Sequence, residues 1–133
     1  MPKEHINPAE VFKHPYYDAI VTVTEPQKIH FFAGRCSTND DYSCFAPGDY
    51  LAQYRRVMEL LDTELKVVGA TWSDIVQRRV FTLDVDEFLR HSADPVIAAY
   101  WDPERRPVST LIGVTRLSNP EFLVEIDMIA VTG

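Results

Sequence analysis

Residues 122–131, with the sequence FLVEIDMIAV, alternate between two kinds of side chain. The first set is wholly apolar and consists of Val124, Ile126, Met128 and Ala130. The second set mixes apolar residues with two acids and consists of Leu123, Glu125, Asp127 and Ile129. Because successive side chains of a strand point to opposite faces, the pattern predicts a strand with one buried face. Its other face would line a polar pocket or an oligomer interface, although pattern alone also allows Glu125 simply to face solvent.

Other segments repeat with the period of a strand or of a helix. DAIVTVT and KIHFFAG read as two strands joined by the turn Glu25-Pro26-Gln27, which predicts a hairpin. DIVQRRVFTL and STLIGVTR read as further strands. Apolar residues recur every three or four positions from Asp49, a candidate N-cap, to Gly69, and predict a helix. A second helix is predicted over residues 84–101, with a kink or a restart at Pro95.

The resulting order is β-β-α-β-α-β-β, which favours an α+β fold with both helices on one face of a single sheet. The chain has 133 residues, enough for one core, so residues 1–133 are expected to form a single domain. Strands this apolar cannot leave their second face in water, and we expect a subunit partner or a ligand to cover it. The first dozen residues and the loop from Cys36 to Pro47 are expected to be loosely held.

Composition excludes several function classes. A formal net charge of −7 works against attraction to phosphate backbones, so nucleic acid is not an expected partner. There is no apolar run of membrane-spanning length and no secretory signal pattern, which indicates a soluble cytoplasmic protein with no membrane partner. The four histidines and two cysteines lack metal-ligand spacing, so no metal site is expected and Cys36 and Cys44 are interpreted as reduced thiols.

Five motifs, in this order along the chain, resemble those of the RidA/YjgF family of reactive-intermediate deaminases. They are HPYYDAI, FFAGRCS, RRVFTLDVDEF, RPVSTLIGVTRL and LVEIDMIAV. The resemblance implies a chorismate-mutase-like subunit and a homotrimer, with the sheets around a central barrel and a ligand cleft at each subunit interface. It also implies hydrolysis of an imine to a ketone and ammonia without a metal or an organic cofactor.

The resemblance assigns roles to individual residues. Tyr16 matches a pocket tyrosine, and Gly34 matches a strand-end glycine whose backbone meets the ligand. Glu125 matches the glutamate that positions the attacking water. Ser109 stands where the family keeps an arginine that holds the substrate carboxylate, and Leu111 stands where a small residue is common. The chain thus resembles a divergent member that lacks the carboxylate anchor.

Three arginines are candidates to replace the missing anchor. Arg35 directly follows Gly34 and is the first choice, whereas Arg105 and Arg106 precede Pro107. An ion pair between Arg35 and Asp40 or Asp41 in its own loop is the competing interpretation. Ser92 or Asp94 would fill the position of a family asparagine.

These observations predict a cofactor-independent hydrolase or deaminase-like enzyme that acts on a small polar metabolite, an imine, an enamine or a related compound. Because a serine offers one neutral bond where an arginine offers two charged ones, carboxylate binding would be weaker by about tenfold or more. Turnover of imino acids derived from serine or threonine is therefore expected to be weak. The alternatives are a non-catalytic small-molecule-binding trimer and an interaction or chaperone-like protein.

Overall fold

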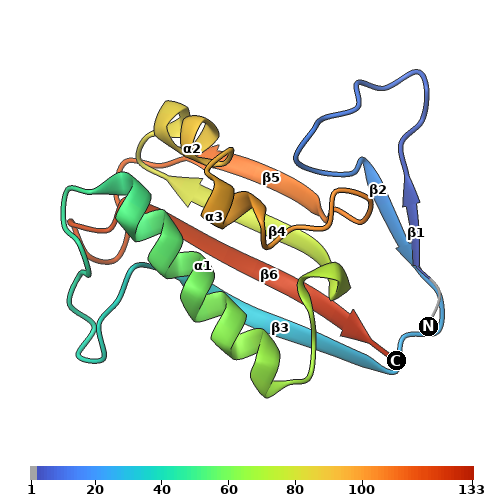
Figure 1. Cartoon of the computed structure of the whole chain (residues 1–133), viewed down its shortest axis with the longest axis horizontal. Helices are drawn as coiled ribbons and strands as arrows, with labels where there is room; N and C mark the ends of the chain where they lie inside the picture. The colour runs from blue at the N-terminus through green and yellow to red at the C-terminus, as the bar shows by residue number, and fades with distance from the viewer. Residues whose placement is uncertain (1–2) are drawn as a thin grey trace.

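A computed structural model describes residues 3–133. Its main body is a four-stranded sheet with helices packed on one face (Figure 1). In spatial order the sheet consists of β3 (Lys28–Arg35), β6 (Val124–Thr132), β4 (Ile75–Thr82) and β5 (Val108–Gly113). The helices are α1 (Tyr50–Val67), α2 (Val85–His91) and α3 (Pro95–Ala98), and a short 3-10 turn, η1 (Trp72–Asp74), precedes β4. This arrangement confirms the predicted α+β class with both main helices on one face.

β6 is an inner strand that pairs antiparallel with β3 and with β4. β4 and β5 pair in parallel, so the chain between them must cross from one end of the sheet to the other. The crossover carries α2 and α3. Among residues 3–133 no helix is both long and apolar enough to cross a membrane.

The core lies between the apolar face of β6 and one stripe of α1. The alternation predicted for β6 is confirmed, because Val124, Ile126 and Ala130 are fully buried. The stripe of α1 that meets this face contributes Tyr54, Val57, Met58, Leu61 and Leu65. For β6 and α1, the period of apolar residues in the sequence was therefore sufficient to predict which face of each element is buried.

The predicted helix boundaries also hold. The Asp49 side chain accepts a hydrogen bond from the backbone of Ala52 at 3.1 Å and caps α1. Gly69, with φ of 71°, follows the end of α1. Pro95 occupies the first turn of α3 after a break from α2, so the second helical segment restarts there.

The predicted hairpin is wrong. β2 (Ile20–Val23) pairs with β1 (Lys3–Ile6) in a separate two-stranded sheet, and β3 pairs with β6 instead (Figure 1). The link between them contains Pro26, which lacks a backbone N–H, and Glu25 at φ of 52°, so the chain turns away instead of folding β2 back. The expectation of a loosely held N-terminus is also wrong for Lys3–Ile6, since these residues form β1 and pair with β2.

The loop that follows β3 is well packed, contrary to expectation. Cys36, Ser37, Thr38 and Cys44 are buried, and a β-bridge joins Thr38 to Cys44. The two cysteines pack on Phe122, which is fully buried just before β6. The loop has a small core of its own, which its polar composition concealed.

The second face of the sheet is uncovered in the single chain. Phe31 is 76% exposed and Ile29 is 51% exposed, both on the side of β3 that points away from the helices. Apolar side chains this open on a sheet are typical of a surface that meets another protein or a ligand. This is the bare face that the sequence pattern predicted.

Gln53 on α1 joins the loop after β3 to the entrance of β6. Its side chain is fully buried. Nε2 donates to the carbonyls of Ala46 at 3.2 Å and Glu121 at 3.0 Å, and Oε1 accepts from the backbone N–H of Leu123 at 2.9 Å. The side chain thus replaces part of a sheet ladder between segments that do not pair directly.

We expect Gln53→Ala to lower the free energy of unfolding by about 2–3 kcal/mol, because buried backbone groups lose their partners. Urea unfolding followed by circular dichroism measures the change. Gln27→Ala, at an exposed position between β2 and β3, is the control and should change stability by less than about 0.5 kcal/mol. Equal stability of the two variants would contradict the assignment.

Candidate functional site

Glu125 lies on the uncovered face of β6, opposite Phe81 of β4. One of its carboxylate oxygens, Oε1, accepts a hydrogen bond from the Sγ of Cys36 at 3.3 Å. The residue is partly buried, so the carboxylate has a fixed neighbour and retains contact with the open face. It is placed to act on a molecule that approaches this face.

Gly34 provides the space that the carboxylate of Glu125 occupies. A Cβ added at position 34 would lie 2.7 Å from Oε2 and 2.8 Å from Cδ of Glu125, closer than real contacts allow. The register between β3 and β6 also shifts between Phe32 and Arg35, as at a bulge. The two sequence candidates Gly34 and Glu125 therefore lie together, and the glycine is required by the glutamate.

Cys36 was interpreted from the sequence as an ordinary thiol, and the structure places it against Glu125. Burial and the hydrogen bond to the Glu125 carboxylate raise the pKa of the Cys36 thiol far above its ordinary value. The group therefore stays protonated at neutral pH and serves as a donor to the carboxylate. The spacing of Gly34, Cys36 and Glu125 in the sequence could not reveal this contact, because it depends on the bulge.

Arg35 does not join Glu125. Its Nε lies 2.7 Å from Oε1 of Glu64 on α1, so the side chain points toward the helices. Arg35 is opposite Ile126, whose side chain faces the core, and a cross-strand partner projects from the same face. Nor does Arg35 pair with Asp40 or Asp41. The predicted pairing of Arg35 with Glu125 across one ligand-sized gap is absent from the chain.

A second group of residues surrounds Arg78 of β4, on the helix side of the sheet. Arg78 is 5% exposed, and its Nε donates to Oγ of Ser109 at 2.9 Å. Its guanidinium carbon lies 5.7 Å from the ring centre of Phe88 and 5.2 Å from that of Trp101. Arg78 and Ser109 are directly opposite each other in the parallel pair β4–β5.

Most of the other sequence candidates gather at this arginine. Two small hollows flank Arg78, and Tyr16 lines both. One is also lined by Tyr54, Ser92, Ala98, Trp101 and Arg106. The other is also lined by His14, Tyr17, Phe88, Leu89, Ser109 and Leu111. The structure therefore brings Tyr16, Arg106, Ser109 and Leu111 together, and places Arg105 elsewhere.

The sequence analysis missed Arg78 although a signal was present. In the strand over residues 74–83, the period of two puts Arg78 on the same face as Val80 and Thr82, and all three are buried. Arg79 is on the other face and pairs with Asp127, its Nη2 lying 2.6 Å from Oδ2. An arginine at a position that alternation assigns to the core is rare, and it would have identified Arg78 as a candidate functional residue.

The electrostatics around Arg78 are dominated by positive charge. Burial lowers the pKa of Arg78, and the neighbouring Arg106 lowers it further. Burial, Arg78 and Arg106 together lower the pKa of His14, which is therefore neutral at pH 7. The Nδ1 of His14 accepts a hydrogen bond from the backbone of Tyr16 at 3.0 Å, as a neutral imidazole can.

Asp18 fastens the segment that carries Tyr16 to the start of β5. Its buried carboxylate accepts hydrogen bonds from Asn7 at 2.9 Å and from the backbone of Arg106 at 3.1 Å, and lies 2.7 Å from Nδ1 of His5. Its own backbone N–H donates to the carbonyl of Pro107 at 3.1 Å. These contacts fix the aromatic wall of the hollows.

Of the two candidates for the asparagine position, Ser92 lies beside Arg78 and Asp94 does not. The Ser92 hydroxyl is 3.1 Å from the hydroxyl of Tyr54 and lines one of the hollows. Asp94 is engaged by Arg55 and caps α3. Position 92 is therefore the one that can reach a molecule bound beside Arg78.

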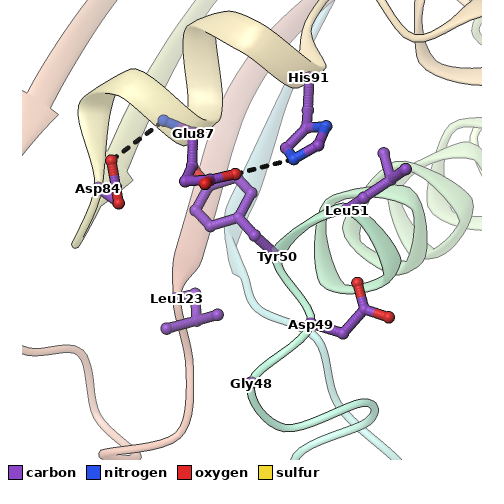
Figure 2. Close-up of a pocket in the computed structure, with 8 residues that line it drawn as sticks. All are labelled: Gly48, Asp49, Tyr50, Leu51, Asp84, Glu87, His91 and Leu123. Carbon is purple, nitrogen blue, oxygen red and sulfur yellow. Dashed lines mark hydrogen bonds and ion pairs between the residues drawn. The ribbon is translucent and has the colours of Figure 1, made fainter.

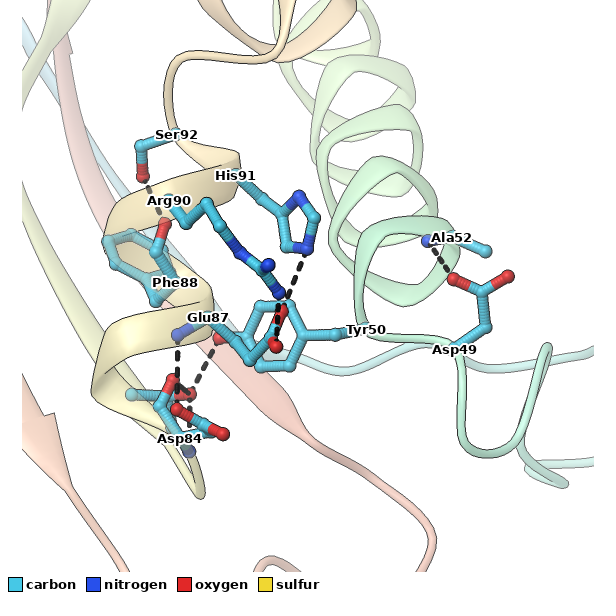
Figure 3. A network of polar contacts seen from close by, with 10 residues as sticks. Asp49, Tyr50, Ala52, Asp84, Glu87, Phe88, Arg90, His91 and Ser92 are labelled. Atoms are coloured by element: carbon cyan, nitrogen blue, oxygen red, sulfur yellow. Dashed lines mark hydrogen bonds and ion pairs between the residues drawn. The ribbon is translucent and has the colours of Figure 1, made fainter.

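A further hollow lies between the start of α1 and α2 (Figure 2). Its acidic side chains already have structural partners. Asp49 caps α1, Asp84 caps α2, and Glu87 binds Arg90 and His91 (Figure 3). No group of three or more potential metal ligands occurs among the described residues. We interpret this hollow as a junction between the two helices.

The two groups of candidate residues are on opposite faces of the sheet. Glu125 and Gly34 are on the uncovered face, whereas Tyr16, Ser109 and Arg78 are on the helix face. One molecule of ligand size cannot contact both groups within one chain, because the sheet lies between them.

Comparisons with known proteins identify sequences similar to this chain. A family model described as Endoribonuclease L-PSP matches residues 10–132. A RutC family protein of Synechocystis is 31% identical over 84 residues, which span 63% of this chain and 62% of that protein. A RutC family protein of Pyrococcus abyssi is 28% identical over 100 residues, which span 75% of this chain and 76% of that protein.

Solved structures share the fold. A protein of unknown function from the conserved Rid protein family of Yersinia pestis, YyfB, has a TM-score of 0.85 at 25% identity, covering 99% of this chain and 100% of that one. A putative endoribonuclease of Thermotoga maritima has a TM-score of 0.68 at 24% identity, covering 90% of this chain and 93% of that one.

We expect Gly34→Ala to displace the Glu125 carboxylate from Cys36 with little loss of stability. The clash involves the end of a flexible side chain, so the unfolding free energy should fall by less than about 1 kcal/mol. A crystal structure of the variant locates the carboxylate, and urea unfolding gives the stability. Gly113→Ala, where the added Cβ would lie 3.4 Å from Val85, is the control and should leave Glu125 in place.

Proposed function

The chain belongs to the Endoribonuclease L-PSP family, the RidA/YjgF family that its motifs resemble, and on this premise we propose that it is a cofactor-independent, deaminase-like hydrolase. Its substrate is a small imine or enamine. The reaction takes place in a cleft between copies of the chain, and its products are a carbonyl compound and ammonia.

Glu125 is the proposed catalytic residue. Its carboxylate orients a water molecule and accepts a proton as the water oxygen bonds to the imine carbon. Glu125 returns this proton to the nitrogen, which gives a neutral carbinolamine. The carbinolamine hydroxyl then passes its own proton through Glu125 to the nitrogen, the C–N bond breaks, and ammonia and the carbonyl compound are released. Cys36 supports this role, because a protonated thiol at 3.3 Å holds one oxygen and leaves the other available.

One observation supports the cleft between copies more than any other. The Glu125 group and the Arg78 group are on opposite faces of the sheet, and the face that carries Glu125 exposes Phe31 and Ile29. A closed symmetric assembly covers that face and brings Glu125 of one copy beside the hollows of the next. The proposed assembly is the homotrimer that the motifs imply.

The family description names an endoribonuclease, and the charge of this chain argues against that activity here. Its formal net charge is −7, which repels a phosphate backbone. The two arginines of the candidate site line small hollows and do not form an exposed basic surface. A small molecule fits these hollows better than a nucleic acid does.

We expect Glu125→Gln to reduce kcat by about a hundredfold or more, because the amide keeps the shape of the side chain and cannot accept the proton. The substrates are 2-imino acids generated in situ from amino acids by an amino-acid oxidase, with semicarbazide trapping the imine that remains. Glu59→Gln, on the exposed side of α1, is the control and should retain full activity. Unchanged turnover in Glu125→Gln would refute the catalytic assignment.

We also expect Phe31→Glu to dissociate the assembly, since it places a charge on the face that the copies would bury. Light scattering at micromolar concentration should give about three times the 15.2 kDa chain mass for the unmodified protein and a lower mass for the variant. Val67→Glu, at an 82% exposed position on α1, is the control and should keep the mass of the unmodified protein. A monomeric unmodified protein would contradict the proposed cleft.

A further inference from the structure

Arg78 is a buried cation that pairs with no acidic side chain among residues 3–133. It is 5% exposed, and the groups that shift its pKa are Tyr54 and Arg106, neither of which is a carboxylate. Its hydrogen-bonding neighbours are neutral hydroxyls, that of Ser109, which accepts from Nε at 2.9 Å, and that of Tyr54. A buried charge is normally retained only when it is paired, so an arginine in this state is suited to an anion that is not part of the chain.

The position of Arg78 relates it directly to residue 109. The two residues are opposite each other on β4 and β5, so their side chains project from the same face of the sheet. The guanidinium therefore lies beside Ser109, the position on β5 where the family motif that this chain resembles has an arginine. The expectation of a lost carboxylate anchor considered position 109 alone.

The surroundings hold the guanidinium in one orientation. The rings of Phe88 and Trp101 lie within 5.7 Å and 5.2 Å of it, and the bond from Nε to Ser109 is 2.9 Å long. An arginine has five N–H donors, and with Nε on Ser109 and one bond to Tyr54, donors on Nη1 and Nη2 remain for a planar acceptor. A carboxylate matches that edge with two parallel charged hydrogen bonds.

Arg106 strengthens the attraction for an anion. It lines the same hollow as Arg78, and its guanidinium carbon lies 6.0 Å from the ring centre of Tyr16. Two cations at one hollow repel each other, and a bound anion relieves that repulsion. The second hollow adds the apolar side chains of Phe88, Leu89 and Leu111, which suit a short aliphatic chain.

We propose that Arg78 is the carboxylate-binding residue of this protein, with Ser109 as the residue that positions it and Arg106 as a second cation. The ligand class is a small 2-imino or 2-oxo acid with a short apolar side chain. The inference rests on the proposed function, because the carboxylate is that of the substrate hydrolysed with the help of Glu125. It reverses the expectation that imino acids are poor substrates.

Binding of 2-oxobutanoate, a product-like acid, tests the inference separately from catalysis. Isothermal titration calorimetry of the unmodified protein should show binding of 2-oxobutanoate and at least about tenfold weaker binding of neutral 2-butanone. Arg78→Met should bind 2-oxobutanoate at least about tenfold more weakly, because it removes the charge and keeps much of the volume. Arg90→Met is the matched control and should bind normally, since Arg90 is exposed on α2, pairs with Glu87 and lines neither hollow.

Arg78→Met should fold, because an apolar side chain replaces a buried unpaired charge. Circular dichroism checks this. If the variant misfolds, Ser109→Ala replaces it, and loss of the bond to Nε should then weaken 2-oxobutanoate binding severalfold.

The results separate the two proposals. Glu125→Gln should bind 2-oxobutanoate as the unmodified protein does, so normal binding by this variant and weak binding by Arg78→Met support the inference whether or not turnover is detected. Normal binding of 2-oxobutanoate by a folded Arg78→Met overturns the inference even if Glu125→Gln abolishes turnover. So does the absence of binding by the unmodified protein at about 10 mM 2-oxobutanoate.

Discussion

The packing of β6 against α1 positions the rest of the molecule. β6 is hydrogen-bonded on both edges, to β3 and to β4, and its apolar face is buried under one stripe of α1. Since strand side chains alternate, burying Val124, Ile126 and Met128 necessarily turns Glu125 and Asp127 to the opposite face. Placement of the proposed catalytic carboxylate is therefore a consequence of core packing.

Polar groups at the two halves of the site are supported in different ways. Gly34 has no side chain, which leaves space for the Glu125 carboxylate beside β3. Cys36, in the buried loop that follows, donates a hydrogen bond to that carboxylate. On the other face, aromatic rings and Ser109 hold Arg78 within the protein. The contacts that hold each half lie within the single chain, and the proposed assembly has only to bring the halves together.

Local patterns in the sequence predicted the helices and strands, but they failed to predict which strands pair with each other. The helix from Asp49 to Gly69 and the restart at Pro95 follow from capping residues and spacing, which act within a few residues. The pairing of β3 with β6 joins segments that are roughly a hundred residues apart in the sequence, and it depends on the free energy of the whole sheet. The loop from Cys36 owes its order to Phe122, again a distant residue.

The sequence by itself determined the α+β class, the apolar face of β6, the family and the candidates Gly34 and Glu125, because these depend on period, spacing and motif. Only the tertiary structure decided which candidates meet. It directed Arg35 to Glu64, placed Cys36 on Glu125 and put Arg78 beside Ser109. The physical reason is that contact across strands depends on register and on bulges, which a linear pattern does not encode.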